Sequence, residues 1–354
     1  MKILFYINVF NRGGAERVMS VLANHFAKND NQVVLVNSFK VDNEYQLDKK
    51  IKHLYLDNND FNSRFQKNHS RITRLRKILK QEKPDVAISF MAEPNFRLLL
   101  ASAFLKTKTI ISIRNDPEKE YCGRVLGMAA KLLFRFADGV VFQTDDAKKW
   151  FPTEVQKKSE IIINPVDDSF YSVSYCSTKN IVSIGRLTDQ KNQKMLISAF
   201  SKIASKTSEN LYIYGEGPLE KELRKYINDL GMNDRIFLPG IVTDVKNVLS
   251  SAKLFVLSSK YEGMPNSLME AMAVGVPCIS SDCPCGGPRM LLNGELNVLL
   301  YNTEDENSLA DLLLKLINDK GLCKKYSDLI KKRALSFKTS SICSEWAKFI
   351  ESVR

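Results

Sequence analysis

Two carboxylates, Glu262 and Glu270, lie eight residues apart in the segment YEGMPNSLMEAMAVGVP (261–277). The Gly, Pro and Asn residues between them predict a loop that turns into a helix, because proline suits the first helical turn, where its missing N–H is not needed. Glu262 would lie in the loop and Glu270 in the helix. Free N–H groups and the helix dipole make such a helix start an anion site, and a carboxylate beside it accepts hydrogen bonds from sugar hydroxyls. A solvated helix that carries two glutamates is the alternative interpretation.

Two cations, Arg186 and Lys191, follow a second apolar strand pattern, NIVSIGR (180–186), and Lys191 stands at the start of a predicted helix. An arginine fork and a lysine point charge at such a strand-to-helix turn suit a diphosphate. Ordinary surface Arg and Lys residues are the alternative interpretation.

The segment EGMPNSLMEAMAVGVPCISSDCPCGGPR (262–289) resembles the signature of glycosyltransferase family 4, retaining enzymes of the GT-B fold. The sequence of this segment is similar to that of bacterial surface-polysaccharide transferases. The resemblance extends over nearly the whole chain and is most specific over residues 181–301. It implies that Glu262 contacts the hydroxyls of the donor sugar, that Glu270 contacts the ribose, and that Arg186 and Lys191 bind the nucleotide diphosphate and stabilise it as it leaves. The other donor-binding positions that it implies are Gly14, Gly215, Gly263, Met264, Pro265 and Asn266.

Arg114 is the remaining catalytic candidate, because many members of the resembled family carry a His near this strand end that approaches the donor sugar. The three His residues of this chain, at positions 25, 53 and 69, lie elsewhere. Arg114 could hold a phosphate or an acceptor hydroxyl, and a strand-end ion pair with Asp116 is the alternative. Glu93 and Asn95, which follow a predicted strand at 84–90, join Arg114 as candidates for the acceptor side.

Strand and helix patterns alternate along the chain, which is typical of doubly wound α/β domains. Residues 167–179 lack periodicity and predict a connection between domains. The expected architecture is an α/β GT-B fold with two Rossmann-like domains facing a cleft: an acceptor domain (1–167), a nucleotide-sugar domain (180–335) and a last helix (336–354). By resemblance this helix packs back on the first domain. The pair Gly13-Gly14 is a tight turn or a phosphate-approaching loop, since it lacks the spacing of a dinucleotide fingerprint.

Composition limits the classes of protein further. Apolar residues make up 44% of the chain, no run approaches the ~20 apolar residues of a membrane span, and no signal-peptide pattern is found. Seven irregularly placed Cys predict no disulfide framework, so a reducing cytoplasm is expected. Residues 1–160 hold 28 Lys and Arg against 18 Asp and Glu, whereas the remainder holds 24 against 22. No nucleic-acid motif accompanies the basic half, so nucleic acid is not an expected partner.

The basic excess concentrates in residues 64–83, where eight Lys and Arg face one acid, Glu82. A helix predicted over 69–83 would place Ile72, Leu75 and Leu79 on one face. We expect this helix to lie on an anionic membrane, with the protein peripheral on the inner face of the cytoplasmic membrane. Packing of its apolar face on its own sheet is the alternative.

The resemblance implies a retaining, metal-independent hexosyltransferase. It would move a hexose or N-acetylhexosamine from a nucleotide sugar, by family frequency a UDP sugar, to a lipid-linked or oligosaccharide acceptor of a bacterial surface glycan. The nucleotide sugar is a co-substrate and no cofactor is expected. The chain contains no D-x-D motif, and no metal ligands are assigned. A catalytically degenerate GT-B subunit and a nucleotide-sugar epimerase are the alternative functions.

Overall fold

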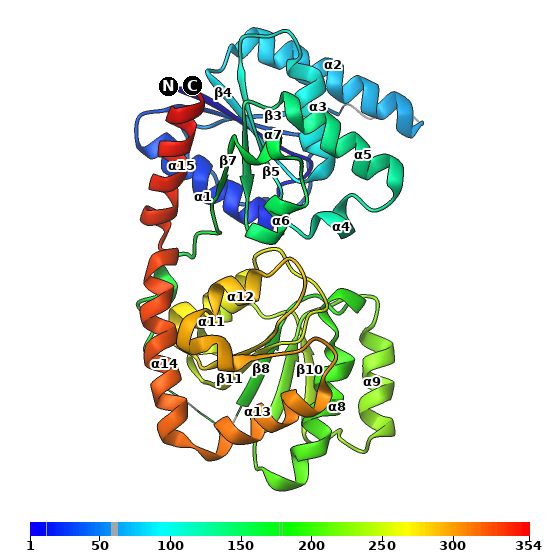
Figure 1. The fold of residues 1–354 in the computed structure, drawn as a ribbon, viewed down its shortest axis with the longest axis vertical. Helices are drawn as coiled ribbons and strands as arrows, with labels where there is room; N and C mark the ends of the chain where they lie inside the picture. The colour runs from blue at the N-terminus through cyan, green and yellow to red at the C-terminus, as the bar shows by residue number, and fades with distance from the viewer. Residues whose placement is uncertain (12, 58–62, 177, 179) are drawn as a thin grey trace. The chain divides into compact units, whose positions relative to one another are not determined.

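The structure, a computed structural model, describes residues 1–11, 13–57, 63–176, 178 and 180–354 (Figure 1). The chain divides into two compact units. The N-terminal unit comprises Met1–Pro165 and Thr339–Arg354, and the C-terminal unit comprises Val166–Lys338. The sequence predicted that the N-terminal domain ends at residue 167 and that the last helix starts at residue 336. The residues expected to form a connection, 167–179, group with the C-terminal unit where they are described.

The sheet of the N-terminal unit has seven parallel strands in the order β3-β2-β1-β4-β5-β6-β7. Strand β1 is its centre and pairs with β2 on one side and β4 on the other. The strands are β1 Lys2–Ile7, β2 Gln32–Asn37, β3 Lys52–Tyr55, β4 Val86–Phe90, β5 Lys108–Ser112, β6 Gly139–Phe142 and β7 Ser159–Ile161. Strand β3 is a short edge strand whose side chains are at most partly buried.

Helices cover both faces of this sheet (Figure 1). One core forms where α1 and α15 pack on the odd-numbered side chains of β1, and the other where α2 and α3 pack on the even-numbered ones. The helix at the end of the chain therefore belongs to the core of the N-terminal unit. The helices are α1 Gly14–Lys28, α2 Arg64–Glu82, α3 Ala92–Ser102, α4 Pro117–Glu120, α5 Arg124–Leu133, α6 Asp145–Lys149, α7 Thr153–Gln156 and α15 Thr339–Val353.

The sheet of the C-terminal unit has six parallel strands in the order β10-β9-β8-β11-β12-β13. The strands are β8 Asn180–Ile184, β9 Asn210–Tyr214, β10 Ile236–Gly240, β11 Ala252–Leu257, β12 Cys278–Ser281 and β13 Leu300–Tyr301. The helices are α8 Gln193–Ile203, α9 Glu220–Asp229, α10 Val245–Ser250, α11 Asn266–Val274, α12 Gly287–Leu291, α13 Glu306–Asn318 and α14 Lys320–Ala334. Strand β13 has only two residues, because Gly294–Leu299 before it form a 3-10 helix. Sequence analysis did not identify α14.

Both units therefore have the doubly wound α/β topology that the alternating pattern predicted. In each sheet the strand order reverses at the first strand of the unit, beside β4 in one and β11 in the other. In open parallel sheets, ligands bind outside the carboxyl ends of the strands at such a switch point. The loops after β8 and β11 meet this condition in the C-terminal unit, and they carry Lys191 and Glu262.

The basic helix of the sequence analysis is α2, and its apolar face is not available to a membrane. Leu75 and Leu79 are buried against the sheet, which is the alternative that the sequence left open. Three of its arginines bind within the unit: Arg71 to Asp57, Arg74 to the Leu56 carbonyl, and Arg76 to the Ala101 and Ala103 carbonyls. No helix among the described residues is both long enough and apolar enough to cross a bilayer.

Candidate functional site

The loops that follow β8 and β11 are joined by an ion pair. The ammonium of Lys191 lies 2.5 Å from Oε1 of Glu262, and the hydroxyl of Ser259 donates to the same oxygen at 2.6 Å. The two charged side chains are 17% and 9% exposed. The structure thus brings together a cation and a carboxylate that sequence analysis had assigned separately, across 71 positions of the chain.

Further hydrogen bonds fix these two loops to one another. Gln190 Nε2 donates to the Tyr261 carbonyl at 3.0 Å, and the amide of Lys260 donates to the Gln190 carbonyl at 2.8 Å. The hydroxyl of Ser258 donates to the Lys191 carbonyl at 2.8 Å. These contacts join the two loops on either side of the charged pair and fix the backbone that carries it.

Arg186 follows β8 and is exposed. Its carbonyl accepts a hydrogen bond from Gln193 Nε2 at 2.7 Å, which fixes the backbone at the start of α8. Its guanidinium makes no hydrogen bond or ion pair with the described residues. The carboxyl end of β8 therefore presents one exposed cation, Arg186, and one paired cation, Lys191.

The segment that carries the two glutamates turns into a helix as the sequence predicted. Pro265 precedes the first residue of α11, Asn266, and Gly263, Met264 and Pro265 are buried. Glu270 lies inside α11 and is also buried. Loop and helix start are confined by α12, because a Cβ on Gly287 would lie 1.7 Å from the Gly263 carbonyl oxygen.

Gly215 lies where the turns after β8 and β9 touch. Its φ is +137°, and a Cβ at this position would lie 1.9 Å from the carbonyl oxygen of Gly185. Any other residue would push the two turns apart. The structure therefore gives Gly215 a role in packing, in addition to the donor-binding role that the resemblance implies.

Cys283 is a neighbour of the charged pair that sequence analysis did not assign to the site. Burial raises the pKa of its thiol to about 12, and the charge of Glu262 adds to this shift. The thiol is therefore protonated at neutral pH. The segment Cys283-Pro-Cys285 is the feature of the sequence that could have identified it. Among the described residues no cluster of His, Cys, Asp and Glu has the arrangement of a metal site.

In the N-terminal unit, Arg114 lies just after β5 and is buried. Its Nη2 donates to Asn164 Oδ1 at 2.5 Å, its Nη1 to Ser112 Oγ at 3.4 Å, and its guanidinium stacks 4.4 Å from the centre of the Phe90 ring. The ion pair with Asp116 that the sequence left open is not formed. Asp116 instead caps α4 by accepting a hydrogen bond from the Glu118 amide.

Glu120 is the carboxylate that acts electrostatically on Arg114, and sequence analysis missed it. Burial lowers the pKa of Arg114 to about 9, which the charge of Glu120 opposes. Burial raises the pKa of Glu120 to about 7, against the effects of the Ala92 amide and of Arg114. Its Oε2 is buried and has no hydrogen-bond partner among the described residues. Arg114 is therefore a cation at neutral pH, whereas Glu120 titrates there.

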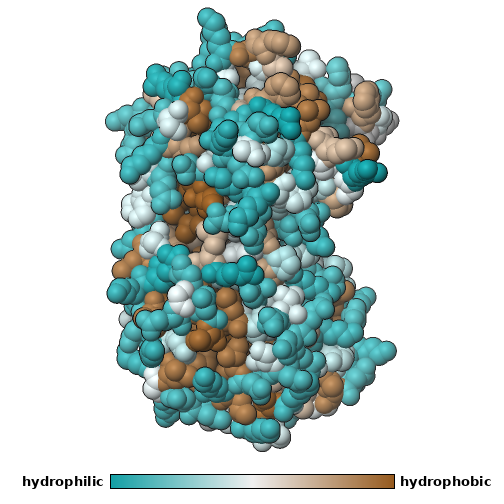
Figure 2. All heavy atoms as spheres, viewed as in Figure 1, coloured by the Kyte–Doolittle hydropathy of each residue, from teal (hydrophilic) through white to brown (hydrophobic). Residues whose placement is uncertain are grey.

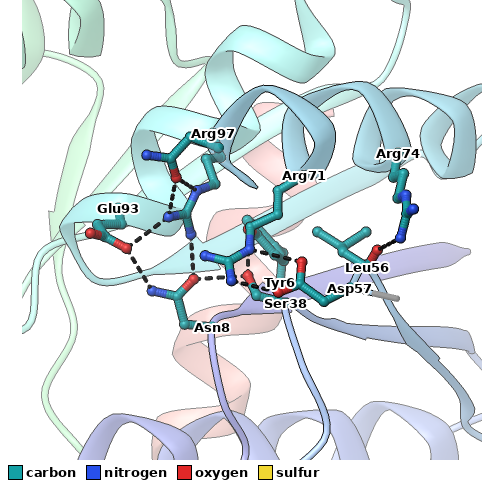
Figure 3. A network of polar contacts seen from close by, with 10 residues as sticks. Tyr6, Asn8, Ser38, Leu56, Asp57, Arg71, Arg74, Glu93 and Arg97 are labelled. Carbon is teal, nitrogen blue, oxygen red and sulfur yellow. Dashed lines mark hydrogen bonds and ion pairs between the residues drawn. The ribbon is translucent and has the colours of Figure 1, made fainter. Parts of the chain in front are cut away.

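Glu93, one of the two other acceptor-side candidates, belongs to a polar network at the carboxyl ends of β1, β2 and β3 (Figure 3). Its half-exposed carboxylate accepts hydrogen bonds from Arg97 Nη2 at 2.7 Å and from Asn8 Nδ2 at 3.2 Å. Arg97 is buried and also donates to Asn8 Oδ1. Beside it, Arg71 forms a bidentate pair with Asp57 at 2.6 and 2.9 Å.

Asn95 and Gly14 differ from Glu93 in their surroundings. Asn95 is fully buried, accepts a hydrogen bond from Ser89 Oγ and donates to the Ser112 carbonyl, so it ties β4 to β5. Gly14 is exposed and is the first residue of α1. Of these two acceptor-side candidates, Glu93 is half-exposed, while the amide of Asn95 is used inside the unit.

Two family models match the chain, one over each unit. Residues 12–170 match "Glycosyltransferase Family 4", and residues 171–333 match "Glycosyl transferases group 1". A relative from Campylobacter jejuni is 30% identical over all of this chain and 99% of its own length. It is named GalNAc-alpha-(1->4)-GalNAc-alpha-(1->3)-diNAcBac-PP-undecaprenol alpha-1,4-N-acetyl-D-galactosaminyltransferase. An uncharacterized glycosyltransferase from Methanocaldococcus jannaschii is 28% identical over 79% of this chain and 82% of its own length.

Solved structures share the fold at low sequence identity. HepE from Anabaena, in complex with UDP and glucose, has a TM-score of 0.84 and 17% identity, and the match covers 99% of this chain and 100% of that one. The apo form of the lipopolysaccharide outer core galactosyltransferase WaaB has a TM-score of 0.78 and 22% identity, and the match covers 99% of each chain. At these identities the likeness establishes the architecture.

Proposed function

Since the chain belongs to glycosyltransferase family 4 and has the GT-B fold, we propose that it transfers a hexose or N-acetylhexosamine from a UDP sugar to a lipid-linked bacterial glycan. The proposed transfer retains the configuration at the anomeric carbon. The observation that carries the proposal is the arrangement after β8 and β11, where exposed Arg186 lies near the Lys191–Glu262 pair. Cations and a hydrogen-bonding carboxylate in one frame suit a sugar linked to a diphosphate.

Each group takes one part of the donor in this proposal. Arg186 and Lys191 bind the diphosphate, and Glu262, oriented by Lys191 and Ser259, accepts hydrogen bonds from sugar hydroxyls. Glu270 and the start of α11 hold the ribose side, with Met264, Pro265 and Asn266 lining the loop. A uridine nucleotide is favoured because HepE, a protein of the same fold, was crystallised with UDP and glucose.

The reaction needs no protein nucleophile. The bond between the anomeric carbon and the diphosphate oxygen breaks, and a bond from that carbon to the acceptor oxygen forms on the same face of the sugar. The acceptor proton passes to the leaving diphosphate. Two cations at that diphosphate stabilise the developing negative charge. We therefore propose a reaction that is independent of metal ions and of any cofactor beyond the nucleotide sugar.

The proposed acceptor is a glycan on a polyprenyl diphosphate. The Campylobacter jejuni relative that matches over its full length is named for such an undecaprenol-linked acceptor, and a second relative from the same organism, 27% identical over 75% of this chain, is named similarly. In the N-terminal unit, Glu93 and Arg114 at the carboxyl edge of the sheet are the proposed contacts to acceptor hydroxyls. An enzyme with a lipid-linked acceptor would act at a membrane surface.

The test is transfer of a labelled sugar from a panel of UDP sugars to an undecaprenyl-diphosphate glycan, with nuclear magnetic resonance of the product to assign the anomer. Arg186→Ala is the diagnostic variant. Loss of a charge-assisted hydrogen bond costs about 1.5–3 kcal/mol, so UDP should bind about ten- to a hundred-fold more weakly. Lys194→Ala, which removes a cation that pairs with Glu222 on the surface, is the control. Equal UDP affinity of both variants would contradict the donor-site assignment, and an inverted product would contradict retention.

A further inference from the structure

Helix α5 of the N-terminal unit has its apolar stripe on the outside. Val125, Met128 and Leu132 lie on one face, and Phe136 of the following 3-10 turn (Phe134–Phe136) continues it. These four side chains are 78%, 58%, 61% and 72% exposed. A helix on the surface of a soluble domain normally turns such a stripe toward the core. Here the face packed on the unit is the one that carries small Gly127 and Ala130.

The end of α3 extends this apolar surface. Leu100 and Phe104 are 48% and 104% exposed, and α3 packs against α5. Brown surface is visible at the upper right of Figure 2, where Figure 1 shows α3 and α5. We call this set the outer apolar face; its residues are Leu100, Phe104, Val125, Met128, Leu132 and Phe136. A cluster of this kind on a soluble unit marks a surface that something covers.

The segments around this face are mostly basic, and acids that border them pair with cations: Glu93 with Arg97, Asp138 with Lys108 and Glu154 with Arg135. Residues 64–81 hold seven Lys and Arg, residues 94–108 hold three and residues 121–137 hold three, and these ranges contain no Asp or Glu. Exposed lysines at 67, 77, 80 and 83 lie on or just after α2, which packs on the other side of α3. Lys80, Lys83 and Lys106 line a cavity of about 540 Å³ together with Asp85 and Leu105, the neighbour of Phe104.

We propose that the outer apolar face is a membrane-docking surface that inserts into an anionic bilayer while the lysines of α2 and Lys106 contact lipid phosphates. Apolar side chains bordered by exposed lysines fit a continuous anionic sheet, and Glu93, the acid of α3, is paired with Arg97. This inference rests on the proposed function in one respect: a polyprenyl-linked acceptor gives the enzyme a reason to bind a bilayer. It differs from docking through α2 alone, since α2 buries its own apolar side and supplies only charge.

Vesicle co-sedimentation of the full chain tests the proposal. Vesicles of equal parts phosphatidylcholine and phosphatidylglycerol should bind the protein, and phosphatidylcholine alone should bind it more weakly. In Met128→Ser/Leu132→Ser, two exposed side chains of the outer apolar face become polar without any loss of core packing. Each should lower the partition coefficient about tenfold, so the pair lowers it about a hundredfold. Ile241→Ser/Val298→Ser is the matched control, because both residues are 54% exposed in the C-terminal unit.

A second measurement reports insertion directly and does not depend on lost binding. The fluorescence that Leu132→Trp adds to that of Trp150 and Trp346 should be quenched by brominated phosphatidylglycerol, whereas the fluorescence that Val298→Trp adds should not. Unchanged sedimentation of the double-serine variant, or equal quenching at positions 132 and 298, would overturn the proposal. Self-association that is lost in the double-serine variant, without vesicle binding by the unaltered chain, would assign the face to a second copy and overturn it as well.

The outcomes are separable from those of the proposed function. UDP affinity, measured by calorimetry without lipid, depends on the C-terminal unit and should be the same in the double-serine variant and the unaltered chain. Vesicle binding without UDP binding would leave the docking surface in place and remove the donor assignment. UDP binding without vesicle binding would leave the donor assignment in place and remove the docking surface.

Discussion

Removing the charge of Lys191 should destabilise the C-terminal unit, whereas removing that of Arg186 should not. Lys191→Met keeps the apolar stem that packs on Gly185 but leaves the Glu262 carboxylate with the Ser259 hydroxyl as its remaining side-chain partner. Loss of one partner of a fully buried pair costs about 3–5 kcal/mol. The two side chains here retain some exposure, so we expect a loss of about 2–3 kcal/mol.

A second substitution isolates the charge. Lys191→Met/Glu262→Gln removes both charges, and its free energy of unfolding should return to within about 1 kcal/mol of the unaltered value, because no unpaired carboxylate remains. The control is Lys260→Met on the adjoining loop, whose partner Asp189 is exposed. Exposed pairs contribute about 0–1 kcal/mol, so this variant should be nearly neutral.

The assay must report on the C-terminal unit. Trp150 and Trp346 both belong to the N-terminal unit, so tryptophan fluorescence would miss the effect. Urea unfolding followed by hydrogen exchange of amides in α8 and α11 reads the correct region. If Lys191→Met loses no more stability than Lys260→Met, or if the double variant is as unstable as the single one, the ion pair does not hold the two loops together and the reasoning is refuted.

Three further predictions follow from the sites described. Arg114→Ala should lower kcat more than it weakens UDP affinity if, as proposed, the guanidinium contacts the acceptor; unchanged kinetics would leave it a purely structural role beside Asn164. Turnover should survive EDTA if cations alone stabilise the leaving diphosphate, and activity that is lost with EDTA and restored by magnesium would contradict this. Burial raises the pKa of Glu120 to about 7, so the folded state holds its proton more tightly than the unfolded state; the stability from this group is present below about pH 4.5 and is lost as the pH rises through 7. Glu120→Gln should therefore match the unaltered protein near pH 4.5 and exceed it by roughly 3 kcal/mol at pH 8. Urea unfolding followed by tryptophan fluorescence measures this difference, and parallel pH profiles of the two proteins would contradict the shift.

The architecture was largely predictable because buried parallel strands leave a strong local signal. Continuous apolar runs such as KILFYI and KLFVL allow few interpretations, and the spacing of apolar residues in α1 and α13 has the helical period. The elements that were missed or misplaced have weak signals of this kind. Strand β3 is a four-residue edge strand with polar positions, α14 is rich in lysine, and β13 has only two residues.

The placement of Glu262 in a loop and Glu270 in a helix also followed from the sequence, because Gly, Pro and Asn act on their own neighbourhood. The pairing of Lys191 with Glu262 did not, since it depends on the strand order that places β8 beside β11. The contact between Arg114 and Asn164 likewise joins residues that are fifty positions apart in the chain. Local patterns cannot identify contacts that exist only after the sheet has formed.

The sequence by itself determined two parallel-sheet units, their order and the local shape of the loops that carry the charged residues. Tertiary structure alone decided which face of each amphipathic helix is covered. Helices α2 and α5 both show apolar spacing, yet Leu75 of α2 is buried and Leu132 of α5 is exposed. Helical periodicity gives the angle between side chains on one helix, but the direction in which the stripe points is set by how that helix packs against the sheet.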